Sequence, residues 1–256
     1  MAKGNIMKIK TLVAVAVSAV ILTGCKNIDH GMLASSGMQL FQAATLSDSD
    51  VKQFSDQACK DMDARNKTAP ASSQYTKRLN KIAKALGSEV NGTPVNYKVY
   101  LTDDVNAWAM ANGCVRVYSG LMKMMNDNEV EGVLGHEMGH VALGHSRKAM
   151  QIAYATVAAR TAATSAGGVA AQLSDSQFAA LGEKLINSQF SQHQESQADD
   201  FSYDLLKKRN INTGGLASGF EKLAKLGSGK SSMFDSHPPS QERAQHIRDR
   251  ITADKK

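Results

Sequence analysis

The sequence lacks an uninterrupted hydrophobic run long enough to cross a membrane. Its two most apolar stretches are residues 12–22 and residues 150–171, and the second contains Gln151, Arg160 and four Ser or Thr residues. A spanning helix needs about 20 consecutive apolar residues. We therefore expect the first stretch to belong to a targeting signal and the second to form a helix packed on protein or lying at a surface.

Acidic residues are absent from residues 1–24, which contain Lys3, Lys8 and Lys10. The whole chain has 30 Lys and Arg against 24 Asp and Glu, a formal charge of +6 that would suit a nucleic-acid partner. Removal of residues 1–24 takes away three lysines and no acid, which halves that charge and leaves no evident basic stripe. We therefore expect no nucleic-acid partner.

Residues 22–25, Leu-Thr-Gly-Cys, follow the first apolar run and resemble the lipobox of bacterial lipoproteins. The resemblance implies that residues 1–24 are a signal peptide, that Cys25 is acylated, and that residues 25–46 are a lipidated N-terminus and tether. Lys26 favours the outer membrane, facing the periplasm, because an Asp at that position would resemble an inner-membrane retention signal. An ordinary secretory signal and an uncleaved anchor are the alternatives.

Cysteine is scarce: only Cys59 and Cys114 follow Cys25. An oxidising periplasm would favour a disulfide between them. Closing that loop would stabilise the fold by roughly 4 kcal/mol in the chain-entropy model. Two buried thiols are the alternative.

Hydrophobic periodicity predicts a predominantly helical α+β fold. Apolar residues three and four apart predict one helix over about residues 51–62, behind the cap candidates Ser47 and Ser49, and another over about residues 75–86 that ends before Gly87. With 42% hydrophobic residues and no internal repeat, residues 47–256 are expected to form one domain.

A small sheet is expected before residue 120. Alternation of apolar and polar residues predicts a strand over residues 95–101. Asn112-Gly113 suits a type I′ turn and precedes a second β-favouring run at residues 114–118. Beyond it, the pattern is almost entirely helical.

Residues 136–140 spell HExxH. On a helix capped near Asn126, His136 and His140 lie one turn apart on one side and can bind one ion. Glu137 is rotated by about 100° and can act as a general base toward an activated water. Two surface histidines one turn apart are the alternative.

Glycine is unusually frequent in the same helix, at positions 132, 135, 139 and 144. Each costs up to about 1 kcal/mol relative to Ala in a helix interior. We expect another backbone, or a substrate, to approach this helix closely.

A catalytic zinc site needs a third protein ligand. His145 lies nine residues after His136, where metzincins place a ligand at ten, and is expected in the last turn of the helix near its C-terminus. Glu195 is the better candidate, with Asp199 one turn later able to orient a ligand histidine. His193 should point away, and a solvated acidic face is the alternative interpretation.

HExxH followed by ExxAD at residues 195–199, with Asn106-Ala107, residues 113–118, His237-Pro238 and Arg243, is similar to the HtpX-like and Oma-type family of zinc endopeptidases. The resemblance covers about residues 50–250 and implies a zincin-like domain with one Zn²⁺. It makes Glu137 the general base, Asp199 the partner of a ligand, and residues 114–118 an edge strand for an extended peptide. The ligands that it implies are His136, His140 and Glu195; the substrate strand is Cys114, Val115, Arg116 and Val117.

His237 and Arg243 are candidates to stabilise the oxyanion of the reaction. A rigid turn at His237-Pro238-Pro239 is an equally good explanation of the first. His246 and Arg248 are expected on a solvated face.

The leading hypothesis is a zinc endopeptidase, held by lipid at the outer membrane, that cleaves unfolded or misassembled envelope proteins in quality control, with other envelope quality-control proteins as possible partners. This substrate class is implied by the resemblance alone. A non-catalytic, metal-containing lipoprotein holdase and a zinc hydrolase of peptidoglycan peptides are the alternatives. Glu137 favours an enzyme, because a structural metal site has no use for a base there.

Overall fold

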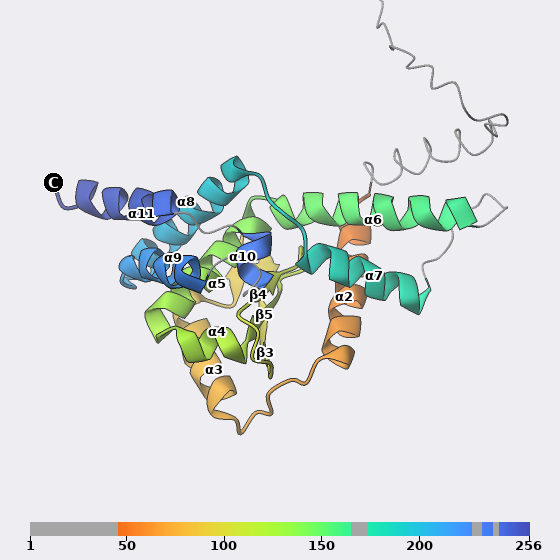
Figure 1. Ribbon diagram of the computed structural model, residues 1–256, viewed down its shortest axis with the longest axis horizontal. Helices are drawn as coiled ribbons and strands as arrows, with labels where there is room; N and C mark the ends of the chain where they lie inside the picture. The colour runs from red at the N-terminus through yellow and green to blue at the C-terminus, as the bar shows by residue number, and fades with distance from the viewer. Residues whose placement is uncertain (1–45, 165–173, 227–231, 238–240) are drawn as a thin grey trace, which may run out of the picture.

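The structure is a computed structural model that describes residues 46–164, 174–226, 232–237 and 241–256 (Figure 1). The predicted signal peptide, the lipidation of Cys25 and nearly all of the tether lie outside these residues. So does the end of the apolar stretch at 150–171. Within the described ranges, no helix is long and apolar enough to cross a membrane.

Helices dominate an α+β fold, as the sequence predicts. The first begins at Ser47, whose side chain and that of Asp50 form a capping box, and the second ends at Gly87, which has φ +106°. The helices are α2 (Asp48–Arg65), α3 (Gln74–Leu86), α4 (Ser119–Met124), α5 (Asp127–Ala142), α6 (His145–Thr164), α7 (Asp175–Ile186), α8 (Gln192–Lys208), α9 (Gly214–Leu226), α10 (Ser232–Ser236) and α11 (Gln241–Ala253).

The main sheet has three strands in the order β3-β5-β4. They are β3 (Asn96–Tyr100), β5 (Cys114–Tyr118) and β4 (Ala107–Ala109). β3 pairs with β5 in parallel, and β4 pairs with β5 antiparallel. The prediction that residues 114–118 form an edge strand is therefore wrong: β3 and β4 cover both sides of β5, and β4 is the antiparallel edge.

The turn between β4 and β5 also differs from the prediction. Gly113 donates its N–H to Met110 O (2.9 Å) and has φ +80°, whereas Asn112 is not left-handed. The loop is thus a turn over residues 111–112 followed by a left-handed glycine, a common three-residue hairpin loop. Two consecutive left-handed residues occur instead at Asn91 (φ 47°) and Gly92 (φ 80°), which join β1 (Glu89–Val90) to β2 (Thr93–Pro94).

Helix α5 lies at the centre of the domain, between α8 and α9 and against β4 (Figure 1). Its glycines allow this packing. A Cβ at Gly132 would lie 2.6 Å from the backbone nitrogen of Leu216, and one at Gly139 would lie 3.0 Å from the backbone of Ala198. The predicted close approach is confirmed, and it lets α8 bring its own polar residues against α5.

Helices α2, α6 and α7 form a second helical group that packs on the sheet through α2 (Figure 1). Cys59 of α2 is bonded to Cys114 of β5, with an S–S distance of 1.94 Å. The alternative of two free thiols is therefore wrong. The disulfide connects this group to the central strand of the sheet.

Candidate metal centre

The HExxH motif lies in the second half of α5, which begins at an Asn126 N-cap reinforced by Glu129 in a capping box. His136, Glu137 and His140 are 0%, 2% and 1% exposed. A surface pair of histidines is thus excluded. Three polar side chains on one buried helix require partners from elsewhere in the fold.

Glu195 of α8 and His237, directly after α10, complete a cluster with the two histidines. Glu195 Oε1 lies 3.3 Å from His140 Nε2 and 3.0 Å from His237 Nδ1. His136 Nε2 lies 3.1 Å from His140 Nε2, 3.3 Å from His237 Nδ1 and 3.5 Å from Glu195 Oε2. The three ligands expected from sequence therefore converge, together with a fourth possible donor.

These separations fit a bound divalent metal. Tetrahedral ligands at metal distances of about 2.0–2.1 Å are about 3.3 Å apart, which matches the 3.0–3.5 Å between the donor atoms. Burial lowers the pKa of His140 well below its ordinary value, so its ring is neutral at pH 7, the form that ligates. Burial opposes the charge on Glu195, but its contacts with the rings of His140 and His237 outweigh burial and lower its pKa.

Hydrogen bonds behind the two α5 histidines orient their rings. His136 Nδ1 donates to Asp199 Oδ1 (2.8 Å), so its Nε2 lone pair faces the cluster. His140 Nδ1 lies 3.0 Å from His145 Nδ1, and His145 Nε2 lies 3.3 Å from Gln197 Oε1. Because the amide oxygen only accepts, His145 donates to it and accepts from His140, which directs the His140 Nε2 lone pair toward the cluster.

Asp199 therefore lies where it can orient the ring of His136, as expected from the sequence. The place expected for His145 was wrong: α5 ends at Ala142, Gly144 turns the chain with φ +74°, and His145 is the first residue of α6. It is not part of the ligand cluster. Its spacing from His136 excluded it as a ligand, but no sequence signal indicated its contact with His140.

Arg243 of α11 bridges the two carboxylates of α8. Its guanidinium lies 2.6 Å from Glu195 Oε2 and contacts Asp199 through Nε (2.8 Å) and Nη2 (2.7 Å). It also lies over the ring of Phe220, 4.2 Å from the centroid. This side chain therefore holds a ligand and the partner of a ligand in place, and its expected role toward an oxyanion stays a prediction.

For His237 the sequence left two interpretations open, a residue that stabilises an oxyanion and a residue of a rigid turn. It follows a short helix, and its side chain is buried in the cluster, with Nδ1 at the ligand atoms and Nε2 3.6 Å from Glu137 Oε1. Burial opposes its charge, but the neighbouring carboxylates Glu137 and Glu195 raise its pKa. Pro238 and Pro239 lie outside the described residues.

Glu195 Oε2 lies 2.6 Å from Arg243 Nη1, whereas the nearest ion-pair partner of Glu137 Oε1 in the described residues is His237 Nε2, 3.6 Å away. Glu137 Oε1 is buried and has no hydrogen-bond partner within the described part of the chain. Burial raises the pKa of Glu137, which increases its affinity for a proton. A buried carboxylate beside a ligand cluster, raised in pKa and with a free lone pair, can accept a proton from a water held there.

The remaining candidates fall where the sequence indicated. His193 is exposed, and His246 and Arg248 are surface residues paired with Asp200 and Glu221. One aromatic ring at the site was not predicted from the sequence. The ring of Phe190 stacks on that of His140, with centroids 3.8 Å apart, and no local pattern distinguishes it from an ordinary core aromatic.

Comparison with known proteins agrees with this geometry. The model of peptidase family M48 matches residues 72–251. The chain is 64% identical to metalloprotease LoiP of Escherichia coli, over 97% of this chain and 99% of that one, and 63% identical to metalloprotease YcaL of the same organism, over 96% and 98%. It is 26% identical to the E. coli β-barrel assembly-enhancing protease, over 87% of this chain and 46% of that one. The chain therefore belongs to peptidase family M48 and is a metalloendopeptidase.

Proposed function

We propose that this protein is a zinc endopeptidase of the bacterial envelope that hydrolyses unfolded or misassembled envelope proteins. The observation that carries the peptidase chemistry is the buried His136, His140 and Glu195 cluster with the unpartnered Glu137 Oε1 beside it. Two imidazoles and one carboxylate are the donor set of several zinc peptidases. Zinc is therefore the metal that these residues fit best.

When bound, the metal would polarise the scissile carbonyl and acidify a water. Glu137 Oε1 accepts the proton of that water and returns it to the leaving amine. His237, whose Nε2 faces Glu137, is the candidate donor to the oxyanion. Asp199 and Arg243 keep the ligands aligned during turnover.

The substrate adds to β4 as an extended strand. β4 is an edge of the sheet and packs against α5, which carries the HExxH motif. The backbone groups of residues 106, 108 and 110 pair with β5, so those of Ala107 and Ala109 lie on the other side of β4, where the Ala109 carbonyl accepts from Ser146 Oγ (3.1 Å). Pairing with main-chain groups imposes little sequence requirement, as suits a protease of unfolded chains.

The envelope location is supported by the lipobox ending at Cys25 and by the Cys59–Cys114 disulfide, which suits an oxidising compartment. The name of one relative refers to β-barrel assembly, an envelope process. Palmitate labelling with membrane fractionation tests the anchor: the Cys25→Ser variant should incorporate no label and leave the outer-membrane fraction. Outer-membrane retention of that variant would contradict lipid anchoring.

Casein cleavage by the full-length chain in detergent tests the peptidase chemistry. Cleavage should stop with a chelator, return with Zn²⁺, and fall at least about 100-fold in Glu137→Gln, which removes the base but not a ligand. Glu131→Gln, an acid on the same helix outside the cluster, is the matched control.

Equal activity of Glu137→Gln and wild type would refute the mechanism. Zinc binding and prevention of aggregation without cleavage would identify a holdase instead. Cleavage of peptidoglycan peptides but not of casein would redirect the substrate class.

A further inference from the structure

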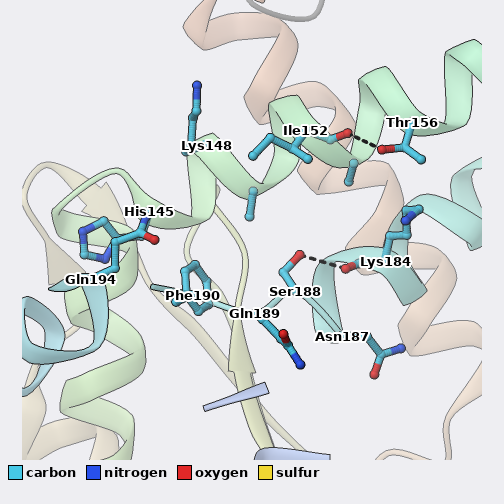
Figure 2. A pocket seen from close by; sticks show the side chains of 12 residues that line it. His145, Lys148, Ile152, Thr156, Lys184, Asn187, Ser188, Gln189, Phe190 and Gln194 are labelled. Atoms are coloured by element: carbon cyan, nitrogen blue, oxygen red, sulfur yellow. Dashed lines mark hydrogen bonds between the residues drawn. The ribbon is translucent and has the colours of Figure 1, made fainter. Parts of the chain in front are cut away.

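A cavity of about 440 Å³ lies between α6 and α7, on the side of the metal centre away from α9 (Figures 1 and 2). Its walls come from the first turns of α6, the end of α7 and the segment that leads into α8. The side chains that define it are His145, Lys148, Ile152, Lys184, Ser188 and Phe190.

The cavity begins directly beside the metal ligands. His145 lines it and lies 3.0 Å from His140 through their Nδ1 atoms. Phe190 lines it too, and its ring stacks on that of His140. A smaller cavity shares Phe190 and Ala149 with it and reaches Ala109 of the edge strand β4. A peptide lying on β4 could therefore place a side chain in this cavity.

The lining of the cavity is basic and contains no acid. None of its 12 side chains is an Asp or a Glu, whereas Lys148 and Lys184 stand on its two helical walls (Figure 2). Neither lysine forms an ion pair within the described residues. Glu183, the acid next to Lys184, faces Arg65 of α2 instead (3.6 Å). Both ammonium groups therefore lack a counter-charge within the described residues, and in Figure 2 the side chain of Lys148 points away from the other labelled side chains.

The cavity also has an apolar wall. Ile152 is 57% exposed, one of two large hydrophobic side chains with such exposure in the described ranges, and Ala149 and Ala153 lie beside it. An occupant with methylene groups ending in a carboxylate could cover Ile152 and bring its charge to the lysines, whose flexible stems let the ammonium groups turn toward it.

We propose that this cavity is a specificity subsite for an acidic side chain, Glu above all, of the polypeptide substrate near the scissile bond. The inference rests on the proposed peptidase function and adds a sequence preference to it. A C-terminal carboxylate has the same charge, but its capture typically uses a nest of backbone N–H groups. Here the charge comes from two mobile side chains, so an internal acidic residue is the better occupant.

The test uses full-length protein and a peptide that it cleaves, found by mass spectrometry of a casein digest. Each of the three positions on either side of the cleaved bond is changed in turn to Glu, Gln or Lys, and kcat/KM is measured for each. Wild type should favour Glu over Gln about fivefold at one position or at two neighbouring positions, the effect of about 1 kcal/mol from partly exposed ion pairs.

Variants assign that preference to the cavity. The Glu-to-Gln ratio should fall to about 1 in Lys148→Ala/Lys184→Ala, and Lys148→Glu/Lys184→Glu should favour Lys at the same position. Lys77→Ala/Lys84→Ala, which removes two exposed charges from α3, should keep the wild-type ratio. Because each ratio is taken within one variant, a change in the amount of folded enzyme does not alter it.

Equal Glu-to-Gln ratios in wild type and Lys148→Ala/Lys184→Ala would overturn the inference and leave the peptidase function intact. A preference that disappears when the peptide is amidated at its C-terminus would also overturn it, in favour of terminal-carboxylate recognition. Failure of wild type to cleave any peptide would count against the peptidase function itself.

Discussion

Two buried polar clusters in this protein have opposite characters. One surrounds Asp63 of α2, which accepts from Arg116 (2.8 and 2.9 Å), Lys98 (2.6 Å) and Tyr100 (2.8 Å). Arg116 is 1% exposed and also donates to the carbonyl oxygen of Asn96 (2.9 Å). Each charge in this cluster has a partner of opposite sign or a hydrogen bond, so the protein satisfies it alone.

The metal centre is not satisfied in this way. The Nε2 atoms of His136 and His140 face each other at 3.1 Å, and both are acceptors because each ring carries its proton on Nδ1 and donates it to Asp199 or His145. Glu137 Oε1 has no hydrogen-bond partner among the described residues, and His237 Nε2 lies 3.6 Å from it. A cluster that supplies its own counter-charges stabilises the fold, whereas one whose lone pairs converge on a common point is built for a cation and a water.

The largest expected effect is the loss of zinc binding and cleavage on substitution of a metal ligand. Glu195→Gln keeps the size of the side chain but removes the charged donor, so we expect zinc content to drop and casein cleavage to fall by more than about 100-fold, beyond the loss typical for a ligand's partner. Metal analysis after gel filtration measures the first and a casein assay the second. Full zinc stoichiometry and affinity in this variant would eliminate Glu195 as a ligand.

The disulfide lies next to the Asp63 cluster, and its removal should cause the largest loss of stability. Cys59→Ala/Cys114→Ala opens a link across 55 residues, and the free energy of unfolding should fall by roughly 4 kcal/mol. Chemical denaturation measures it, with reduced wild type as the control for lost side-chain packing. We expect zinc binding to persist below the new melting temperature. A double variant as stable as oxidised wild type would show that the covalent link contributes nothing.

The ligand residues could be predicted because their information is local. HExxH fixes two ligands within one turn of a helix, and Glu195 and Asp199 share one face of another. The capping boxes at Ser47 and Asn126 and the close approach at Gly132 also depend on residues near in sequence or on a missing side chain. These features can therefore be predicted without knowing which helices and strands pack against one another.

The errors came from pairing between distant segments. The resemblance implied that residues 114–118 are an edge strand, but β3, paired with β5 so that Asn96 lies beside Cys114, occupies the second side of β5. Strand order depends on the packing of the whole sheet and is not encoded in one strand. The two-residue strands β1 and β2 are too short for a period to be visible, so the Asn91-Gly92 hairpin was overlooked. The two carboxylate partners of Arg243 belong to another helix, so its contacts with them were not predicted either.

The contribution of the Asp63 cluster to stability should depend on pH, because protonation of Asp63 removes its negative charge. Burial opposes ionisation of Asp63, but hydrogen bonds from Arg116, Lys98 and Tyr100 outweigh it and lower its pKa to about 2. A depressed carboxyl pKa stabilises the fold above the unfolded pKa of about 4, and that contribution is lost as pH falls from about 4 to about 2.

Asp63→Asn should therefore cost about 3 kcal/mol of unfolding free energy at pH 7, because it also leaves the buried Arg116 without its counter-charge. The difference from wild type should shrink between pH 4 and pH 2 in urea titrations. Lys60→Gln, at an exposed position of the same helix without an ion pair in the described residues, should change stability by at most about 0.5 kcal/mol. A pH-independent difference would contradict the assigned pKa.

The smallest expected effect separates a ligand from the residue that orients it. Asp199→Asn keeps a hydrogen-bond acceptor for His136 Nδ1 but removes the negative charge shared with Arg243, so zinc affinity should fall by 10–100-fold. Titration against a competing chelator measures it, with Asp200→Asn, the adjacent surface acid, as the control. Excess zinc should restore cleavage in Asp199→Asn but not in Glu195→Gln, because only the second loses a charged ligand oxygen. If Asp199→Asn binds zinc as tightly as Asp200→Asn, the orientation of His136 does not depend on the Asp199 carboxylate. Only the metal ligands would then distinguish the metal centre from the Asp63 cluster.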